Sequence, residues 1–543
     1  MPRSMQEHPL LIKQLIQFAS REHANREVVT MTAQGLVRSN YQDIERRARQ
    51  LSCSLVRLGI RMGDRIATLM TNSQWHFELY YGVSCMGAIC HTINPRLFLQ
   101  QLVYIIGDAD DRVLFVDRDF LPLVEEIGTQ IGSVTDIVVV GGLPQSTRFP
   151  GRIRLHDYET FLAEGNSEYE WPDFDERLPS SLCYTSGTAG NPKGVLYTHR
   201  STVLHAYAAN SKDAFNLGAA DVVLPLVPMF HANCWAFPYT CPMVGAKLVF
   251  SQLSLLDGPS VTRLIQQEKV TFAVGVPTIW AALLRHLQDT GEAIPTVERL
   301  QAGGAACPFP IVHQFYSEFG IPVIHGWGMT ETSPIGAINR EKPDMADWPI
   351  EQRLANQRKQ GRGICGIEMK VVDDQGKEVP RDGVTSGTLM VRGHWVVEAY
   401  FGQSEAALDN GWLDTGDIAT IDQLGFMEIV DRAKDIIKSG GEWISSAKLE
   451  QIAMELPGIT RAAAIPVPHP KWDERPLLLV VAQSDLPLDR QQVLDHFQGK
   501  VARWWVPDDV VFVPELPQTN TGKLIKTGLR AAYARHYDAR QEG

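Results

Sequence analysis

The sequence lacks the patterns that mark a disulfide-rich, zinc-binding or transition-metal protein. Its eight cysteines, scattered from Cys53 to Cys365, include no CxxC pair, so neither a disulfide framework nor a zinc knuckle is expected. Its fifteen histidines include no HExxH pair, which gives no support to a catalytic transition metal. We therefore expect reduced and mostly buried cysteines.

The sequence also has no excess of positive charge. It carries 51 Lys and Arg against 63 Asp and Glu, a formal net charge of −12, which argues against a nucleic acid as partner. Its start, MPRSMQEHPLLIKQ, is unlike a signal peptide, and the uncharged stretch Leu79–Cys90 is too short to cross a bilayer. We expect a cytoplasmic protein with no integral membrane association.

A length of 543 residues is too great for one compact core, so two or more domains are expected. Short apolar runs separated by helix-length segments predict parallel α/β structure. Helices are predicted at Tyr41–Gly59 and Ser73–Met86, and strands at Arg65–Met70, Ala88–Ile93, Val113–Asp117, Ile137–Val140, Ser181–Thr185, Val222–Leu226, Lys247–Phe250, Thr271–Val274 and Arg299–Ala302.

After about Gly361 the pattern changes to strands punctuated by glycine, which predicts a barrel-like β segment. The last hundred or so residues mix strands and helices in a length that suffices for a small core of its own. The predicted architecture is therefore an α/β protein. A large N-terminal domain, 1–430, holds two α/β subdomains and the β segment, and a small mobile α+β domain, 431–543, follows.

The stretch Tyr184–Val195, YTSGTAGNPKGV, is a strand followed by a loop suited to phosphates. Glycines let backbone N–H groups converge on an anion, hydroxyl groups add donors, and Lys193 supplies positive charge. A plain Gly/Pro surface turn is the alternative, although Ser, Thr, Gly and a terminal Lys rarely coincide there. The loop lacks the GK[ST] ending of a P-loop, so a conventional kinase or ATPase is not indicated.

This loop resembles the phosphate loop of the adenylate-forming superfamily, which includes acyl-CoA synthetases, luciferases and nonribosomal-peptide adenylation domains. Six further segments match the superfamily's motifs in order and cover nearly the whole chain: MFHANCW at Met229–Trp235, GGAAC at Gly303–Cys307, HGWGMTET at His325–Thr332, WLDTGD at Trp412–Asp417, VDRAKDIIKSGGEWIS at Val430–Ser445 and QTNTGKLIK at Gln518–Lys526. Within the superfamily the chain is most similar to medium- and long-chain fatty-acyl-CoA synthetases and methylmercaptopropionate-CoA ligases.

The resemblance implies an enzyme that activates a carboxylic acid with ATP and Mg²⁺ and passes the acyl group to CoA. It implies catalytic roles for Lys523, His231, Glu331 and Thr185, of which Glu331 and Thr185 hold the Mg²⁺. A helix-capping acid is the alternative for Glu331, and a buried structural histidine for His231. The implied ATP and AMP contacts are Thr185, Ser186, Gly187, Thr188, Lys193, His231, Gly303, Gly304, Ala305, Trp327, Gly328, Met329, Thr330, Asp417, Arg432 and Lys523.

The same resemblance assigns the acyl pocket, the hinge and the CoA site. The acyl pocket would be lined by His231, Trp235 and Gly303, and the small domain would rotate about Asp431 between the two half-reactions. The implied CoA-binding residues are Lys434, Lys438, Ser439, Gly440, Gly441, Glu442 and Trp443. For the two lysines, ordinary solvated charges are the alternative.

Several other functions stay open at this point. A luciferase-like oxygenase shares these motifs, and a phosphotransferase would release ADP instead of AMP and pyrophosphate. A non-catalytic nucleotide-binding regulator need not keep Lys523, Glu331 and the hinge together. The expected partners are a small carboxylic acid, ATP and CoA, with a homodimer as the oligomeric state considered.

The resemblance generates a prediction for Lys523. Lys523→Ala removes a cation that would stabilise the charge developing on the carboxylate and α-phosphate, so acyl-adenylate formation should fall by roughly 10² to 10³ fold. Thioester formation from chemically made acyl adenylate should be largely spared. Both rates are measured on one purified mutant, and a parallel loss in the two half-reactions would contradict the assignment.

Overall fold

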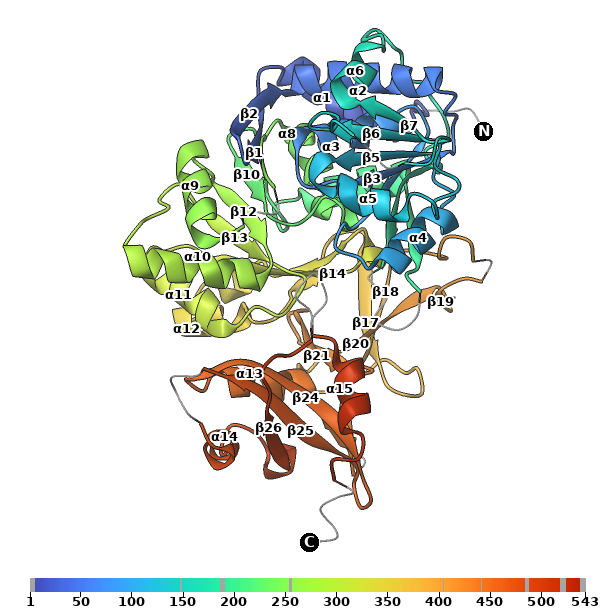
Figure 1. Cartoon of the computed structure of the whole chain (residues 1–543). Coiled ribbons are helices and arrows are strands. Elements are labelled where there is room, and N and C mark those ends of the chain that lie inside the picture. The colour runs from blue at the N-terminus through green and yellow to red at the C-terminus, as the bar shows by residue number, and fades with distance from the viewer. Residues whose placement is uncertain are drawn as a thin grey trace. The chain divides into compact units, whose positions relative to one another are not determined.

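The structure is a computed structural model that describes residues 5–146, 149–185, 191–252, 256–403, 405–440, 442–483, 488–517 and 524–537 (Figure 1). The density of contacts divides the chain into two units. The first comprises Met1–Glu368 and Arg392–Leu413, and the second comprises Met369–Val391 and Asp414–Gly543. Asp431 lies inside the second unit, so the domain boundary at this residue stays a prediction.

The first unit contains a seven-stranded sheet that is parallel except for its last strand. The helices α4 (Leu99–Asp108) and α5 (Leu121–Ile127) pack on one face of it, where their apolar side chains join those of the strands in one core. In order across the sheet the strands are β7 (Arg154–Asp157), β6 (Asp136–Val140), β5 (Val113–Asp117), β3 (Arg65–Leu69), β4 (Ile89–Thr92), β8 (Pro179–Tyr184) and β9 (Gly194–Thr198).

The helix predicted at Tyr41–Gly59 is α2 (Tyr41–Arg57), and its sequence explains both ends. The side chain of Asn40 accepts a hydrogen bond from the Asp43 N–H and so caps the start. Gly59, with a φ of 90°, follows the last turn. The helices that contact α2 are α1 (Lys13–Glu22), α3 (Gln74–Ser84) and α6 (Tyr158–Ala163), and the other helical elements of this half include α7 (His199–Ala209) and the short turn η1 (Arg118–Phe120).

A nine-stranded sheet forms the other half of the first unit. Six of its strands run in parallel, while β15, β16 and β2 are antiparallel to their neighbours. In order the strands are β16 (Arg362–Gly363), β15 (Ile335–Ile338), β14 (Val323–Gly328), β13 (Arg299–Ala302), β12 (Phe272–Gly275), β10 (Val222–Pro225), β11 (Lys247–Ser251), β1 (Glu27–Thr32) and β2 (Gly35–Asn40).

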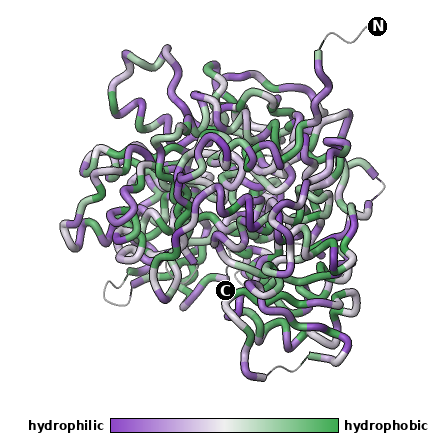
Figure 2. Tube along the Cα trace, turned by 90° about the horizontal axis from the view of Figure 1, so that it is seen from above, coloured by the Kyte–Doolittle hydropathy of each residue, from purple (hydrophilic) through white to green (hydrophobic). Residues whose placement is uncertain are grey.

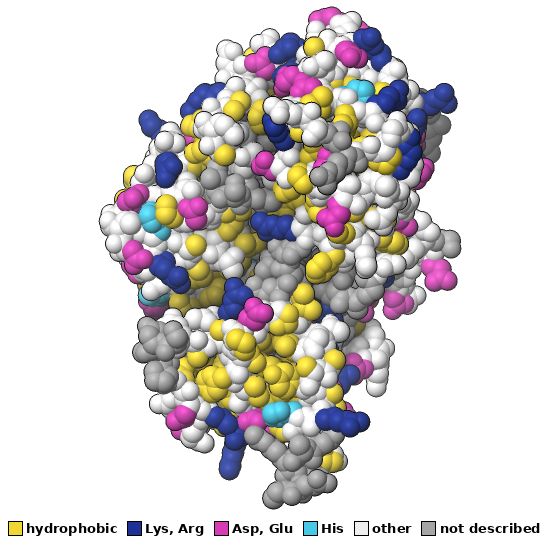
Figure 3. Space-filling view, in the orientation of Figure 1, with side chains coloured by type: hydrophobic (Ala, Val, Ile, Leu, Met, Phe, Trp, Pro, Cys, Tyr) yellow, Lys and Arg dark blue, Asp and Glu magenta, His cyan; other side chains and the backbone are white. Residues whose placement is uncertain are grey.

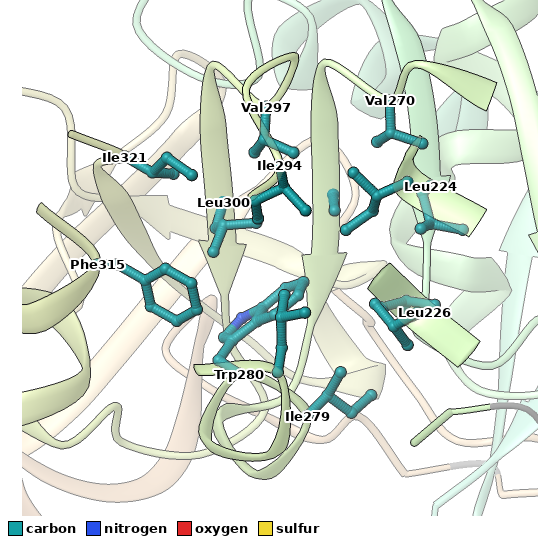
Figure 4. Packing of buried hydrophobic residues seen from close by; sticks show 14 of the residues in the cluster. Leu224, Leu226, Val270, Ile279, Trp280, Ile294, Val297, Leu300, Phe315 and Ile321 are labelled. Carbon is teal, nitrogen blue, oxygen red and sulfur yellow. The ribbon is translucent and has the colours of Figure 1, made fainter. Parts of the chain in front are cut away.

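Helices cover this second sheet and bury a large apolar core against it. Trp280 and Phe315 extend from the helices towards Leu300 and Leu224 on the strands (Figure 4). The helical elements of this half are η2 (Ala232–Ala236), α8 (Phe237–Val244), α9 (Gly258–Glu268), α10 (Pro277–Thr290), α11 (Phe309–Phe319), η4 (Thr330–Thr332), η5 (Pro343–Met345) and α12 (Ile350–Asn356).

The chain also has a stretch without Lys, Arg, Asp or Glu that is longer than Leu79–Cys90, at residues 222–246. It folds into β10, η2 and α8 instead of one continuous helix. Among the described residues, no helix has the length and apolar character needed to cross a membrane.

The second unit is built on β structure, and its boundary with the first passes through three strands of one small sheet. This sheet has the order β17 (Ile367–Val372), β18 (Gly387–Gly393), β20 (Trp412–Ile421) and β19 (Leu408–Asp409), with β21 (Met427–Arg432) also paired to β20. It corresponds to the predicted β segment.

The rest of the second unit is a five-stranded sheet with helices on both faces. Helix α13 (Ser446–Met454) packs on one face with α14 (Arg490–His496), and α15 (Lys526–Tyr533) contributes to the core on the other. The strands are β23 (Glu442–Ile444), β22 (Ile437–Ser439), β25 (Asp473–Ala482), β24 (Ile459–His469) and β26 (Asp509–Phe512), and the short turn η6 (Arg503–Trp505) precedes the last one.

Figure 2 shows hydrophobic and hydrophilic stretches interspersed along the whole tube. Figure 3 shows apolar side chains gathered on the visible face of the second unit.

The core of the nine-stranded sheet generates a prediction. Leu300 is fully buried on β13, three residues before Gly303, so Leu300→Ala should lower the free energy of unfolding by about 2–5 kcal/mol through lost burial and an unfilled cavity. Urea and thermal unfolding measure the change. Ile350→Ala is the control, because Ile350 is 38% exposed. Equal losses in the two variants would contradict the core assignment.

Candidate active site

Three of the predicted site segments lie at one edge of the nine-stranded sheet. Strands β10, β12, β13 and β14 are parallel neighbours, so their carboxyl ends meet at the same edge. His231 follows β10, Gly303 follows β13, and Glu331 follows β14. Sheet topology thus places three segments from within residues 231–331 at the same edge.

The phosphate loop connects the two antiparallel strands β8 and β9 of the other sheet, with Tyr184 paired to Gly194. Its two ends are joined directly, because the Thr185 N–H donates to the Lys193 carbonyl at 2.9 Å and the Lys193 N–H donates to Thr185 Oγ1 at 3.2 Å. Ser186, Gly187 and Thr188 lie outside the described residues. A hairpin connection differs from the strand–loop–helix of P-loop proteins, in agreement with the missing GK[ST] ending.

Lys193 and Glu331 are linked by a tyrosine that the sequence had not singled out. The Lys193 Nζ lies 4.7 Å from the centre of the Tyr400 ring, a cation–π contact. The Tyr400 hydroxyl donates to Glu331 Oε1 at 2.9 Å. Burial and the Glu331 carboxylate raise the pKa of Tyr400, so its hydroxyl stays protonated and remains the donor.

The segment around Tyr400 is itself fixed by backbone hydrogen bonds to both predicted motifs. The Val397 N–H donates to the Glu331 carbonyl at 2.8 Å, and the Phe401 N–H donates to the Gly194 carbonyl at 2.8 Å. Ser333 Oγ donates to the Trp395 carbonyl at 2.9 Å. Thr185, Lys193, Tyr400 and Glu331 therefore form one connected group.

Glu331 is placed by a short turn, η4, directly after β14. The Met329 N–H donates to Thr332 Oγ1 at 3.0 Å, and the Tyr197 hydroxyl donates to the Thr330 carbonyl at 2.7 Å. Glu331 thus lies in a capped turn and is 8% exposed, while its carboxylate accepts from Tyr400. The role of Glu331 as an Mg²⁺ ligand stays a prediction, with the helix-capping acid as its alternative.

Trp327 and Gly328 lie where β14 changes register against β15. A Cβ at Gly328 would lie 1.9 Å from the Pro334 carbonyl oxygen, and a Cβ at Gly336 would lie 2.4 Å from the Trp327 indole. Glycine is therefore required at position 328, next to Trp327, and at position 336, on the following strand. Adenine stacking on Trp327, and nucleotide contacts from Met329 and Thr330, stay predictions.

Trp235 and Gly303 are in contact, and their assignment to an acyl pocket stays a prediction. A Cβ at Gly303 would lie 2.2 Å from Trp235 Cη2, and a Cβ at Gly304 would lie 3.7 Å from Cζ2. Any larger side chain at position 303 would displace the indole. Gly304 has a φ of +77°, and the carbonyl of Ala305 lies 3.3 Å from His325 Nε2.

The turn that carries Trp235 has an unusual backbone. All five residues from Ala232 to Ala236 have φ between 43° and 69°, and none is a glycine. A left-handed conformation costs roughly 1–2 kcal/mol for each such residue, so the surrounding contacts must hold it. His231 precedes the turn with an extended backbone, and its carbonyl accepts from the Cys234 N–H at 3.1 Å.

In the second unit, Asp417 and Arg432 are cross-strand neighbours on β20 and β21. Arg432 Nη1 lies 2.9 Å from Asp417 Oδ1, so the two predicted ribose ligands are an ion pair. The adjacent Asp431 is 4% exposed and its Oδ2 accepts from the Ser446 N–H at 2.5 Å. Burial raises the pKa of Asp431.

The predicted CoA segment forms the β22–β23 hairpin. Gly440 has a φ of +60° and donates its N–H to the Trp472 carbonyl at 2.7 Å. Ser439 accepts from Arg475 at 3.1 Å, and the Lys438 N–H donates to Glu474 at 2.8 Å. Burial lowers the pKa of Lys434. Trp443 lies on β23, whereas Gly441, the Glu442 side chain and Lys523 lie outside the described residues.

Trp472 is a second residue that the sequence analysis missed. It is 43% exposed, and a Cβ at Gly440 would lie 3.0 Å from its ring. Lys471 Nζ lies 4.7 Å from the ring centre. An exposed aromatic face therefore stands beside the turn that the resemblance assigns to CoA.

Comparison with known proteins agrees with this arrangement. The sequence model of the AMP-binding enzyme family matches residues 16–401, and that of the AMP-binding enzyme C-terminal domain matches residues 448–523. The chain therefore belongs to the AMP-binding enzyme family, and it is an AMP-forming acyl-CoA ligase of the adenylate-forming superfamily.

Its relatives include a 3-methylmercaptopropionyl-CoA ligase from Ruegeria lacuscaerulensis, 48% identical over 97% of this chain and 98% of that protein. A medium-chain-fatty-acid–CoA ligase from Ectopseudomonas oleovorans is 46% identical over 97% of each chain. Among solved structures, the anthranilate CoA ligase AuaEII in complex with anthranoyl-AMP superposes with a TM-score of 0.85 at 26% identity, covering 98% of this chain and 100% of that one.

The Tyr400 contact generates a prediction. Tyr400→Phe keeps the ring under Lys193 but removes the hydrogen bond to Glu331, so the Mg²⁺ concentration for half-maximal activity should rise about tenfold, as for one lost hydrogen bond to a charged group. Tyr207→Phe is the control, because Tyr207 is 57% exposed.

A second measurement on the same variants does not depend on turnover. The rise in melting temperature produced by Mg²⁺ with ATP should shrink in Tyr400→Phe and stay the same in Tyr207→Phe. An unchanged Mg²⁺ requirement in Tyr400→Phe would show that the contact does not orient Glu331.

Proposed function

We propose that this ligase acts on linear carboxylic acids with an uncharged tail, with medium- and long-chain fatty acids as the principal substrates. The observation that carries the proposal is the buried Trp235 indole against Gly303. The ammonium group of an amino acid would be left unpaired against such an apolar surface, which is costly. The name of the Ectopseudomonas oleovorans relative supports the same class of acid.

3-Methylmercaptopropionate is the second candidate substrate. The relative from Ruegeria lacuscaerulensis, 48% identical, carries the name of a ligase for this acid. A thioether tail is linear and uncharged, so the same apolar surface would accept it. The two candidates differ in chain length and are separated by a direct comparison of rates.

The residues around Glu331 fit the Mg²⁺ that the family implies. Mg²⁺ prefers oxygen ligands and usually binds through one or two carboxylates together with substrate phosphates and water. Glu331 and Thr185 offer a carboxylate and a hydroxyl, and among the described residues no cluster of three or more His, Cys, Asp or Glu side chains forms a closed metal cage. When bound, the ion would neutralise charge on the pyrophosphate leaving group.

In the first half-reaction a carboxylate must approach an anionic polyphosphate. Lys193 stands at the end of the phosphate loop, where its charge would reduce the repulsion between the two anions. Lys523 would add a second cation at the carboxylate and α-phosphate. No general base is needed, because the attacking carboxylate is already ionised, so positioning and electrostatics account for the catalysis.

In the second half-reaction the thiol of CoA attacks the acyl adenylate and AMP leaves. We assign Asp417 and Arg432 to the ribose, and the β22–β23 hairpin to the pantetheine chain. Asp431 would be the hinge about which the domain 431–543 turns to exchange Lys523 for this hairpin. A cytoplasmic location and a homodimer complete the proposal.

The proposal predicts a defined set of products and an order of substrates. With Mg²⁺, ATP and CoA, octanoate, hexanoate or 3-methylmercaptopropionate should release AMP and pyrophosphate in equal amounts. The value of kcat/KM for these acids should exceed that for leucine by at least about a hundredfold, the scale expected for one unpaired buried charge. Initial rates over the four acids measure the order.

Two outcomes would contradict the proposal separately. ADP as the product would exclude the adenylating mechanism, whereas AMP release with leucine as the preferred acid would leave the mechanism intact and exclude the apolar acyl site.

A further inference from the structure

The left-handed turn Ala232–Ala236 is buried in full, with exposures of 7% or less. Five non-glycine residues in succession adopt a backbone conformation that L-amino acids avoid. Such strain persists only where the surroundings hold it. The contacts of this turn must therefore offset the cost of its backbone conformation.

One side chain ties the middle of the turn to another part of the fold. Asn233 Nδ2 donates to Ser181 Oγ at 2.8 Å, and Asn233 Oδ1 lies 3.5 Å from Cys183 Sγ. Burial raises the pKa of Cys183 to about 11, so the thiol stays protonated and can donate to this oxygen. Both partners lie on β8, the strand that leads directly into Thr185.

The approach to the turn is held separately, through its backbone. Asn72 Nδ2 donates to the carbonyls of Pro225 and Val227 at 3.1 and 2.8 Å, and Asn72 Oδ1 accepts from the Met229 N–H at 2.7 Å. These contacts end before His231. The contacts of Asn233 therefore act on the turn itself and on Trp235 two residues later.

Asparagine suits this position for two reasons. It tolerates the left-handed conformation better than other residues with a side chain, apart from glycine, and its amide supplies one donor and one acceptor to the two partners on β8. Trp235 then meets Gly303 so closely that a Cβ there would lie 2.2 Å from the indole. A small rotation of the turn would move the indole away from, or into, the Gly303 backbone.

We infer that Asn233 is a positioning residue for the acyl site: by fixing the left-handed turn to β8, it sets the orientation of Trp235 and thereby the ligase's preference for acid chain length. The inference rests on the proposed function, in which Trp235 lines the acyl pocket. It adds a residue whose effect on the acid would be exerted through the Trp235 indole.

The test uses the full-length enzyme with Asn233→Gly. Glycine adopts the left-handed backbone without strain, so the substitution removes the amide contacts while leaving the turn free to form. The KM for octanoate should rise about tenfold, the effect of one lost buried hydrogen bond, and the KM for ATP should change less than twofold. The ratio of kcat/KM for octanoate to that for propionate should fall by the same factor of about ten.

The matched control is Asn216→Gly. Asn216 also has a φ of 52° and lies exposed outside the site. This substitution therefore makes the same chemical change and should leave the KM for octanoate, the KM for ATP and the octanoate-to-propionate ratio of kcat/KM unaltered. Ser181→Ala is a second variant that tests the contact between Asn233 and β8. It removes the acceptor of Asn233 Nδ2 without touching the turn and should reproduce the loss of chain-length preference.

A double-mutant cycle with Trp235→Ala separates positioning from a general structural role. If Asn233 acts through Trp235, adding Asn233→Gly to Trp235→Ala should change the KM for octanoate less than twofold. If the double variant instead shows the product of the two separate effects on the KM for octanoate, the inference is wrong. An unchanged octanoate-to-propionate ratio in both Asn233→Gly and Ser181→Ala would also overturn it.

The same cycle distinguishes this inference from the proposed function. If Trp235→Ala alone leaves the preference among acids unchanged, then Trp235 does not line the acyl pocket, and the proposed acyl site fails together with the inference. If Trp235→Ala changes the preference and Asn233→Gly does not, only the inference fails.

Discussion

The hydrogen bonds that join β10, β12, β13 and β14 in parallel determine where three of the predicted site segments leave the sheet. Because these strands share a direction, the segments that leave their carboxyl ends emerge at one edge of the sheet. His231, Gly303 and Glu331 follow these strands and lie at that edge. The phosphate loop lies on the β8–β9 hairpin of the other sheet. Tyr400 contacts both Lys193 of this loop and Glu331.

The site depends on glycine wherever two backbones or a backbone and an indole approach closely. Gly303 accommodates Trp235, Gly328 accommodates the Pro334 carbonyl, and Gly336 accommodates Trp327. The motifs GGAAC and HGWGMTET thus encode close packing. A side chain at Gly303 or Gly336 would displace an indole, and one at Gly328 would displace the backbone at Pro334.

Much of the fold could be predicted from the sequence, and the exceptions have physical causes. The apolar runs at Val113–Asp117 and Arg299–Ala302 are β5 and β13 with these same bounds. The hairpin β1–β2 was missed, because β2 is an edge strand with no fully buried residue and so carries no hydrophobic alternation. The motif residues of the site were identified through resemblance. The contacts of Tyr400 and Asn233 were not predicted, because their hydrogen-bond partners lie 69 and 52 residues away in sequence.

The contact between Trp235 and Gly303 has a consequence for how this enzyme can diversify. The Trp235 indole lies directly against the Gly303 α-carbon, so a side chain at position 303 would need the space that the indole now fills. A bulkier residue at 303 would become acceptable only after Trp235 had been replaced by a smaller one. Replacement at these two positions is therefore ordered in time: Trp235 must give way to a smaller residue before a side chain can be introduced at position 303.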